Sequence, residues 1–192
     1  MKFQFRLAYY LFGNNGLGVV SSLTAPNWFK EGDAVGIETA MTQSGRGRIP
    51  SFDMALRAQL ASGKIYPYAK AVTESYKDFI PNHYVSGYFL TTYLKKKYGN
   101  DAWDKVLTGT YRFPFYPFSF SNNIKKVTGL RVEDLYKNAF LDIQKEWIEE
   151  QNKITENPAT QISSKDKYFS NYLYPQYLPD GRILVVKTGL DI

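Results

Sequence analysis

Apolar residues recur at intervals of three and four along most of the chain, and this spacing is typical of amphipathic helices. The clearest case is the stretch 131–151, in which Leu135, Phe140 and Ile143 fall on roughly one helical face. Strict alternation of apolar and polar residues, the strand pattern, does not appear until the last 25 or so positions. The pattern predicts helices over 5–11, 17–23, 27–41, 51–62, 82–99, 100–107 and 131–151, with a further short helix before Gly129.

Helix ends are marked by residues that cap or break helices. Asn27 and Ser51 stand where an N-cap side chain is favoured, which makes Trp28 the first helical residue of its segment. Gly63 and Gly99 are suited to closing the helices that precede them. The stretch 113–118 contains two prolines among aromatic residues, so it predicts a buried aromatic loop rather than a continuous helix.

The C-terminal part has a different composition. Residues 152–166 form a polar linker, and 168–192 are rich in Tyr, Pro and β-branched residues, which favours extended structure. Leu178 to Arg182 predicts a tight turn and Ile183 to Val186 a short strand. The fold class is therefore mainly α: a compact multi-helix lobe over 1–152, followed by a linker and an extended β tail over 153–192. The tail either packs on the helices or begins a β domain.

Composition and charge exclude several classes of function. The 192 residues include no cysteine and a single histidine, which removes thiolate metal sites and disulfides. The net charge of +6 raises the question of nucleic acid, but the lysine run Lys95 to Lys97 sits in the last turn of a predicted helix, where cations are favoured. No arginine-rich stripe accompanies it, so nucleic acid is rejected as a partner. No apolar run is long enough to span a membrane.

Two carboxylates stand out on the helix predicted over 27–41. Glu31 and Glu38 are seven residues apart, which places both on nearly the same helical face. One carboxylate suits a metal ligand and the other an outer partner that orients the first. The alternative is that Glu31 is an acid of the first turn, stabilised by the helix dipole.

The residues Trp28, Glu31, Gly32 and Ala34 match the W-x-x-E-G-x-A helix of the gluzincin zinc peptidases of aminopeptidase-N type. A second segment of the chain resembles the same family. Tyr84 and Gly87 match its Y-x-x-G helix, and the downstream pattern continues through Leu94, Gly99, Trp103 and Leu107. The resemblance covers about 26–111, and two motifs in the family's order coincide less often by chance than one.

The resemblance implies a site and an activity. Glu31 would be the zinc ligand, Glu38 its outer-shell partner, and Tyr84 the donor to the oxyanion formed when a peptide bond is hydrolysed, with His83 and Trp28 as possible lining. The expected cofactor is zinc and the expected substrate a peptide or protein. Similar helical lobes belong to large Bacteroidetes surface or periplasmic proteins in which a β-propeller-like region follows, so the cell envelope is the expected location.

The sequence also departs from the family. The H-E-x-x-H helix, which supplies two zinc-binding histidines and the general base, is absent, Lys30 replaces the usual asparagine, and Val85 and Ser86 follow the tyrosine. We therefore expect a segment of a longer metallopeptidase-like protein, inactive and without zinc as it stands. The alternative is a noncatalytic helical scaffold or binding module of a cell-envelope protein. In either case the expected partners are its own missing N-terminal lobe and a downstream β domain.

Overall fold

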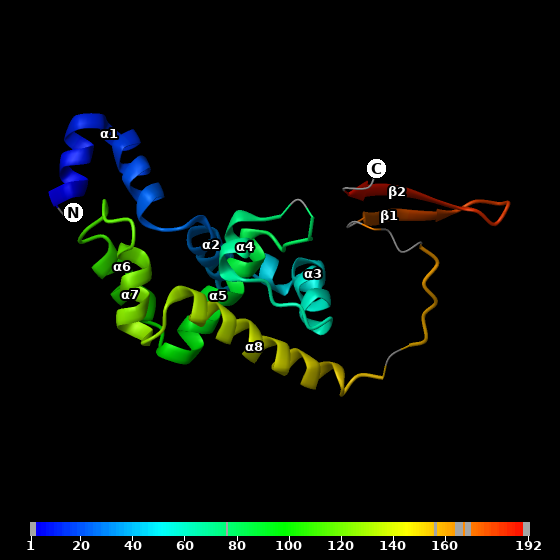
Figure 1. Cartoon of the computed structure of the whole chain (residues 1–192). Helices are drawn as coiled ribbons and strands as arrows, with labels where there is room; N and C mark the ends of the chain where they lie inside the picture. Colours follow the sequence, from blue (N-terminus) through cyan, green and yellow to red (C-terminus); the bar gives the residue numbers. More distant parts are fainter. Residues whose placement is uncertain (1–2, 76, 156, 164–166, 168–169, 190–192) are drawn as a thin grey trace.

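The computed structural model describes residues 3–75, 77–155, 157–163, 167 and 170–189. Within these ranges the chain is mainly helical, with one small antiparallel sheet near its C-terminus (Figure 1). The elements are α1 (Phe3–Thr24), α2 (Asn27–Met41), the 3-10 turn η1 (Arg46–Arg48), α3 (Pro50–Ala61), α4 (Tyr68–Thr73), α5 (His83–Tyr98), α6 (Ala102–Thr110), α7 (Ser119–Thr128), α8 (Val132–Gln151), β1 (Ser170–Tyr177) and β2 (Ile183–Gly189). The mainly helical fold class with a short β tail is thus confirmed.

The core is built by the helices from α2 to α8. At one end of it four aromatic rings meet: Phe29 lies 4.5 Å from Trp103 and 5.5 Å from Phe120 between ring centroids, and Trp28 lies within 6.2 Å of all three. These rings come from α2, α6 and α7, and they tie those helices together. Helices α5 and α8 contribute buried aliphatic and aromatic side chains: Leu90, Leu94, Leu135, Phe140 and Ile143.

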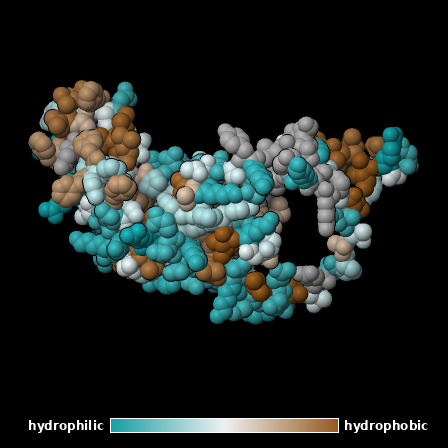
Figure 2. All heavy atoms as spheres, viewed as in Figure 1, coloured by the Kyte–Doolittle hydropathy of each residue, from teal (hydrophilic) through white to brown (hydrophobic). Residues whose placement is uncertain are grey.

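Helix α1 leaves this packed body. It bends at Gly13, whose φ of 61° and ψ of −150° lie outside the helical region, so the two short helices predicted from sequence are joined at that glycine. Large apolar side chains along α1 are exposed, among them Tyr10 at 75% and Leu23 at 71%. Figure 2 shows this hydrophobic surface where α1 stands away from the other helices.

Several local predictions about helix ends are corrected. Asn27 and Ser51 lie inside the first turns of α2 and α3, and the N-cap positions are Pro26 and Ile49, neither of which makes a side-chain cap. At α5 a side-chain cap is present, because Asn82 accepts a hydrogen bond from the backbone N–H of Val85 at 3.2 Å.

The aromatic stretch 113–118 is not buried as predicted. Phe113, Phe115, Tyr116 and Phe118 are each more than half exposed, and only Pro114 of this stretch is enclosed. The core beside it is already filled by residues of α6 and α7, which removes the need for these rings inside.

The β tail forms a hairpin. Strands β1 and β2 pair antiparallel, and the pairing is irregular between Leu173 and Gln176. The predicted turn closes it: the Leu178 N–H donates to Arg182 O at 2.8 Å, and Gly181 has a φ of 82° that a glycine adopts without strain. Residues 168–169 and 190–192 of the predicted tail lie outside the described residues. In Figure 1 the hairpin stands apart from α8.

Among the helices that the structure describes, none combines the length and the apolar character needed to cross a membrane. This agrees with the expectation from sequence.

Candidate functional site

Both sequence motifs lie at one helix crossing. Helices α2 and α5 touch backbone to backbone: a Cβ added at Gly32 would sit 2.1 Å from the carbonyl carbon of Gly87, and one added at Gly87 would sit 1.9 Å from the Trp28 carbonyl oxygen. Only glycine lets two helices approach this closely. The glycine of each motif therefore has a structural role, which is to hold the two motif helices together.

Contacts on the two flanks of α2 show how α5 crosses it. On one flank Asp33 binds Lys95, near the C-terminal end of α5, with an Oδ1 to Nζ distance of 2.6 Å. On the other flank Glu38 binds Arg46, whose guanidinium carbon lies 5.1 Å from the ring centroid of Tyr84, near the N-terminal end of α5. Glu31 and Glu38 share a face of α2 to within about 20°. Glu31 therefore faces the flank on which the N-terminal end of α5, with Tyr84, lies.

Residues 45–48 form a short strap across this flank. The Gly47 N–H donates to Thr39 Oγ1 at 3.0 Å, and Arg48 Nη2 donates to Thr39 O at 2.8 Å, which satisfies a carbonyl at the end of α2. A side chain at Gly45 would meet the backbone of Thr39 at 2.3 Å. The strap is thereby fixed to α2, and it places Arg46 over Tyr84.

Glu38 is engaged twice by Arg46. Its Oε1 accepts from the Arg46 backbone N–H at 3.3 Å, and its Oε2 accepts from Arg46 Nε at 2.8 Å. The predicted outer-shell carboxylate is thus bound to an arginine, in a position that orients the guanidinium.

Tyr84 is half-buried between two neighbours. On one side lies Arg46, and on the other the imidazole of His83, with 4.6 Å between ring centroids and a tilt of 30°. Because Asn82 supplies the cap of α5, the histidine is not needed for that purpose. The predicted tyrosine, its neighbouring histidine and the predicted outer carboxylate are therefore part of one cluster with Arg46, which we call the Arg46 cluster: Glu38, Arg46, His83 and Tyr84.

Glu31 and Trp28 differ from these residues in their surroundings. Glu31 is half-buried, and its carboxylate has no hydrogen bond or ion pair to any described residue. Trp28 is only 5% exposed, and its Nε1–H donates to the Tyr68 hydroxyl at 2.9 Å, so the structure places it in the core beneath the crossing. No hydrogen bond links Glu31 with Tyr84 in the described part of the chain.

The residues present match one zinc ligand rather than a full set. A catalytic zinc of this class takes two histidines and a carboxylate from the protein. The single histidine of the sequence lies against the Tyr84 ring, and no group of three His, Cys, Asp or Glu side chains that would hold a metal occurs among the described residues. Any complete site would need ligands from another segment.

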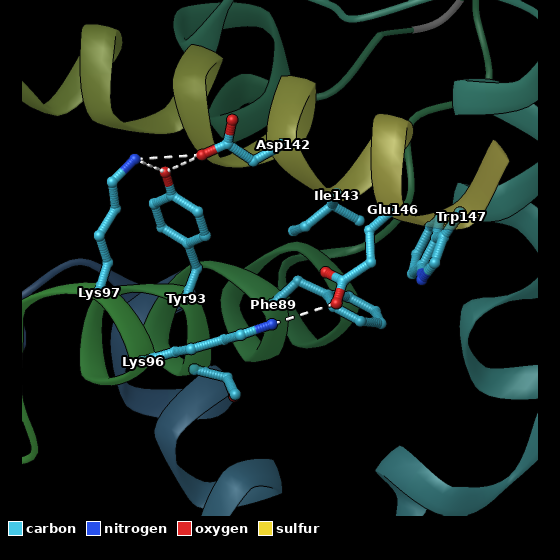
Figure 3. A pocket seen from close by; sticks show the side chains of 9 residues that line it. Phe89, Tyr93, Lys96, Lys97, Asp142, Ile143, Glu146 and Trp147 are labelled. Atoms are coloured by element: carbon cyan, nitrogen blue, oxygen red, sulfur yellow. Dashed lines mark hydrogen bonds and ion pairs between the residues drawn. The ribbon is translucent and has the colours of Figure 1, made fainter. Parts of the chain in front are cut away.

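A second hollow lies between α5 and α8, away from the motifs (Figure 3). It has a volume of about 400 Å³, with Phe89, Ile143 and Trp147 along its apolar wall. Its charged rim is internally paired: Lys96 binds Glu146 at 3.1 Å, and Lys97 binds Asp142 at 3.1 Å. Figure 3 shows the pairs of Lys96 and Lys97 at the rim. The lysine run lies in the last turn of α5 as predicted, and each lysine also pairs with an acid of α8 or, for Lys95, of α2.

Asp142 also accepts a hydrogen bond from the Tyr93 hydroxyl, and this bond, followed by the contact with Lys97, lowers the pKa of the Asp142 carboxyl. Burial raises the pKa of Tyr93, and its bond to Asp142 adds to that effect. These groups stabilise one another across the α5–α8 groove, so each charged side chain among the described residues that line it is already paired.

Arg46 is the member of the site that the sequence did not single out. The only available signal was the G-R-G-R segment at 45–48, since glycines on both sides of an arginine allow close backbone approach and an outward side chain. That pattern is also common in plain surface loops, so the contact with Tyr84 emerges only from the packing of α2 on α5.

A scan of the chain against protein-family models, a search of curated proteins and a search of solved structures each found no match.

Proposed function

We propose that the α2–α5 crossing is the carboxylate-and-tyrosine half of a zinc peptidase site of gluzincin type. The two histidines and the general base would come from a polypeptide segment outside these 192 residues. The reaction would be hydrolysis of a peptide bond in the complete protein, and this chain without that segment would be inactive. The cell envelope is the proposed location, because the motif resemblance implies it.

One observation carries the proposal: the two motifs, about 50 residues apart in the sequence, meet at one helix crossing through Gly32 and Gly87. Helical periodicity then puts Glu31 on the side of α2 that carries Glu38, which pairs with Arg46 beside Tyr84. The glycine of each motif makes the close contact at that crossing, so the two residues that the motif resemblance singles out also have a shared structural role. The free carboxylate of Glu31 suits a metal ligand, because a ligand oxygen must not be engaged by an arginine or lysine.

Each residue has a proposed task. Bound zinc in such a site lowers the pKa of a water molecule and polarises the carbonyl to be attacked. Glu31 would hold the metal, and the Tyr84 hydroxyl would donate a hydrogen bond to the developing oxyanion. Glu38 would not bind the metal itself; it would hold Arg46, which lies beside Tyr84. Trp28 would support the crossing from the core, consistent with its burial.

The test begins with the coding sequence upstream of the Met1 codon. If it encodes H-E-x-x-H, the longer protein is purified and its zinc content and peptide hydrolysis are measured. Glu31→Gln should abolish stoichiometric zinc, whereas Glu149→Gln, an exposed acid of α8, should not. Tyr84→Phe should retain zinc but lower kcat by about 10²- to 10³-fold, as the loss of one oxyanion donor does. Full zinc in Glu31→Gln would refute the assignment.

The second candidate is a noncatalytic helical scaffold. The exposed apolar side chains of α1 favour it, because a surface of this kind in a folded protein usually meets another domain or protein. The absence of H-E-x-x-H upstream of Met1 would support the scaffold and exclude the enzyme.

A further inference from the structure

Arg46 has one edge of its guanidinium free beside the candidate site. Its Nε is bound to Glu38 at 2.8 Å, while Nη1 and Nη2 have no hydrogen-bond partner among the described residues. The side chain is 42% exposed, so solutes can reach it. The guanidinium also lies against the ring of Tyr84, the proposed oxyanion donor.

The position of this arginine is built into the backbone. A Cβ at Gly45 would lie 2.3 Å from Thr39 Cα, so this neighbour of Arg46 must be glycine for the strap to lie this close to α2. A Cβ at Gly47 would lie 2.6 Å from the ring of Tyr88, a side chain that would have to move aside. The Arg48 side chain, two residues later, donates hydrogen bonds to the carbonyls of Thr39 and Thr42. Of the two arginines in the turn, one fastens the strap and the other is directed toward Tyr84.

The chemistry of the free edge points to a carboxylate. A guanidinium is planar, permanently charged and offers parallel N–H donors that match the two oxygens of a carboxylate. Binding of Nε to Glu38 restricts the side chain, so less entropy is lost when a ligand binds. The alternative is that Arg46 and Glu38 form an ordinary exposed ion pair that only fastens the strap. In that case Arg46 would show no preference for a carboxylate ligand.

We propose that Arg46 binds a carboxylate of the peptide ligand at this site. The carboxylate is either the C-terminal α-carboxylate of the peptide or the side chain of an aspartate or glutamate. The inference rests on the proposed function in taking the ligand to be a peptide. It needs no zinc, because the contact is made by the chain itself.

The experiment is an NMR titration of the ¹⁵N-labelled 192-residue chain. The Nε–H resonance of Arg46, assigned by its loss in Arg46→Lys, is followed with four probes: N-acetyl-trialanine, its C-terminal amide, an amidated tripeptide carrying one glutamate side chain, and inorganic phosphate. The free acid should shift the resonance in a saturable manner and the neutral amide should not. A response to the amidated glutamate peptide as strong as that to the free acid would identify a side-chain carboxylate as the ligand.

Variants separate a specific contact from a general charge effect. Arg46→Gln should weaken binding of the free acid by about tenfold, measured from shifts of backbone amides around Tyr84, whereas Arg131→Gln, which removes the same charge from the exposed start of α8, should leave it unchanged. Circular dichroism would check that both variants are folded.

Three outcomes would overturn the inference: no shift with either carboxylate peptide, phosphate binding as tight as the peptide's, or equal losses in Arg46→Gln and Arg131→Gln. The proposed function fails separately, when the longer protein holds no zinc. If the chain binds the carboxylate peptide but the longer protein holds no zinc, the carboxylate site at Arg46 stands and the proposed peptidase function fails. If the longer protein holds zinc but the chain binds no carboxylate peptide, the proposed function stands and the carboxylate site fails.

Discussion

The glycine crossing of α2 and α5 gives the sharpest test of the structure. In Gly87→Ala the new methyl carbon would lie 1.9 Å from the Trp28 carbonyl oxygen, although ordinary contact begins at 3.4 Å. The helices would have to separate by the difference, 1.5 Å, at the point where both sequence motifs meet. Displacements of 0.5–1 Å already forfeit about a quarter to a half of the dispersion energy of a contact.

The expected magnitude follows from two opposing effects. Alanine favours a helix over glycine by about 1 kcal/mol. Overpacking a close contact costs about 1–3 kcal/mol, and more where backbone meets backbone. Because the clash at Gly87 is with backbone, the upper end of that range applies, and after subtracting the propensity gain we expect Gly87→Ala to lower the free energy of unfolding by about 2 kcal/mol, which corresponds to a fall in Tm of roughly 4–8 °C for a chain of this size.

Gly36→Ala is the matched control. Gly36 lies in the same helix α2, and a Cβ there would meet nothing within 4 Å, so only the propensity gain remains. This variant should be more stable than the wild type by about 0.5–1 kcal/mol. Urea unfolding, followed by circular dichroism and by the fluorescence of the buried Trp28 and Trp103, measures both variants. Equal stability of Gly87→Ala and Gly36→Ala would refute the close crossing, and with it the common flank for Glu31 and Tyr84.

Two further predictions concern tyrosines that pack in or against the core. Tyr68→Phe removes the acceptor of the Trp28 indole N–H and leaves a buried donor unpaired, so urea unfolding should show a loss of about 1–2 kcal/mol, whereas Tyr10→Phe on the exposed face of α1 should show none. Burial raises the pKa of Tyr136 to about 12. Because its folded pKa lies above the unfolded value of about 10, its contribution is complete below pH 10 and is lost as the pH rises toward 12, by up to about 2 kcal/mol. Tyr136→Phe should therefore lose less stability than the wild type between pH 10 and 12, and parallel pH profiles of the two proteins would contradict the stated burial.

Much of the local structure was determined by the sequence alone. The helices 27–41, 82–99 and 131–151 follow from apolar spacing, and Gly63, Gly99 and Gly129 end helices because they adopt a positive φ. The hairpin turn at Gly181 follows in the same way from Pro, Asp and Gly. These features depend on a few neighbouring residues, whose conformational preferences act at short range.

The sequence could not determine what depends on packing between distant segments. Whether rings such as Phe115 are buried depends on whether other helices already fill the core, and here Phe120 and its neighbours do. The sequence predicts N-caps at Asn27 and Ser51, whereas the N-cap positions are Pro26 and Ile49. Several nearby residues satisfy the same local rule, and the tertiary path of the chain selects among them. The placement of Arg46 over Tyr84 needs the α2–α5 crossing, a contact between backbones 55 positions apart. Local preferences decide which elements form, whereas only the close approach of two helices decides which side chains share a site.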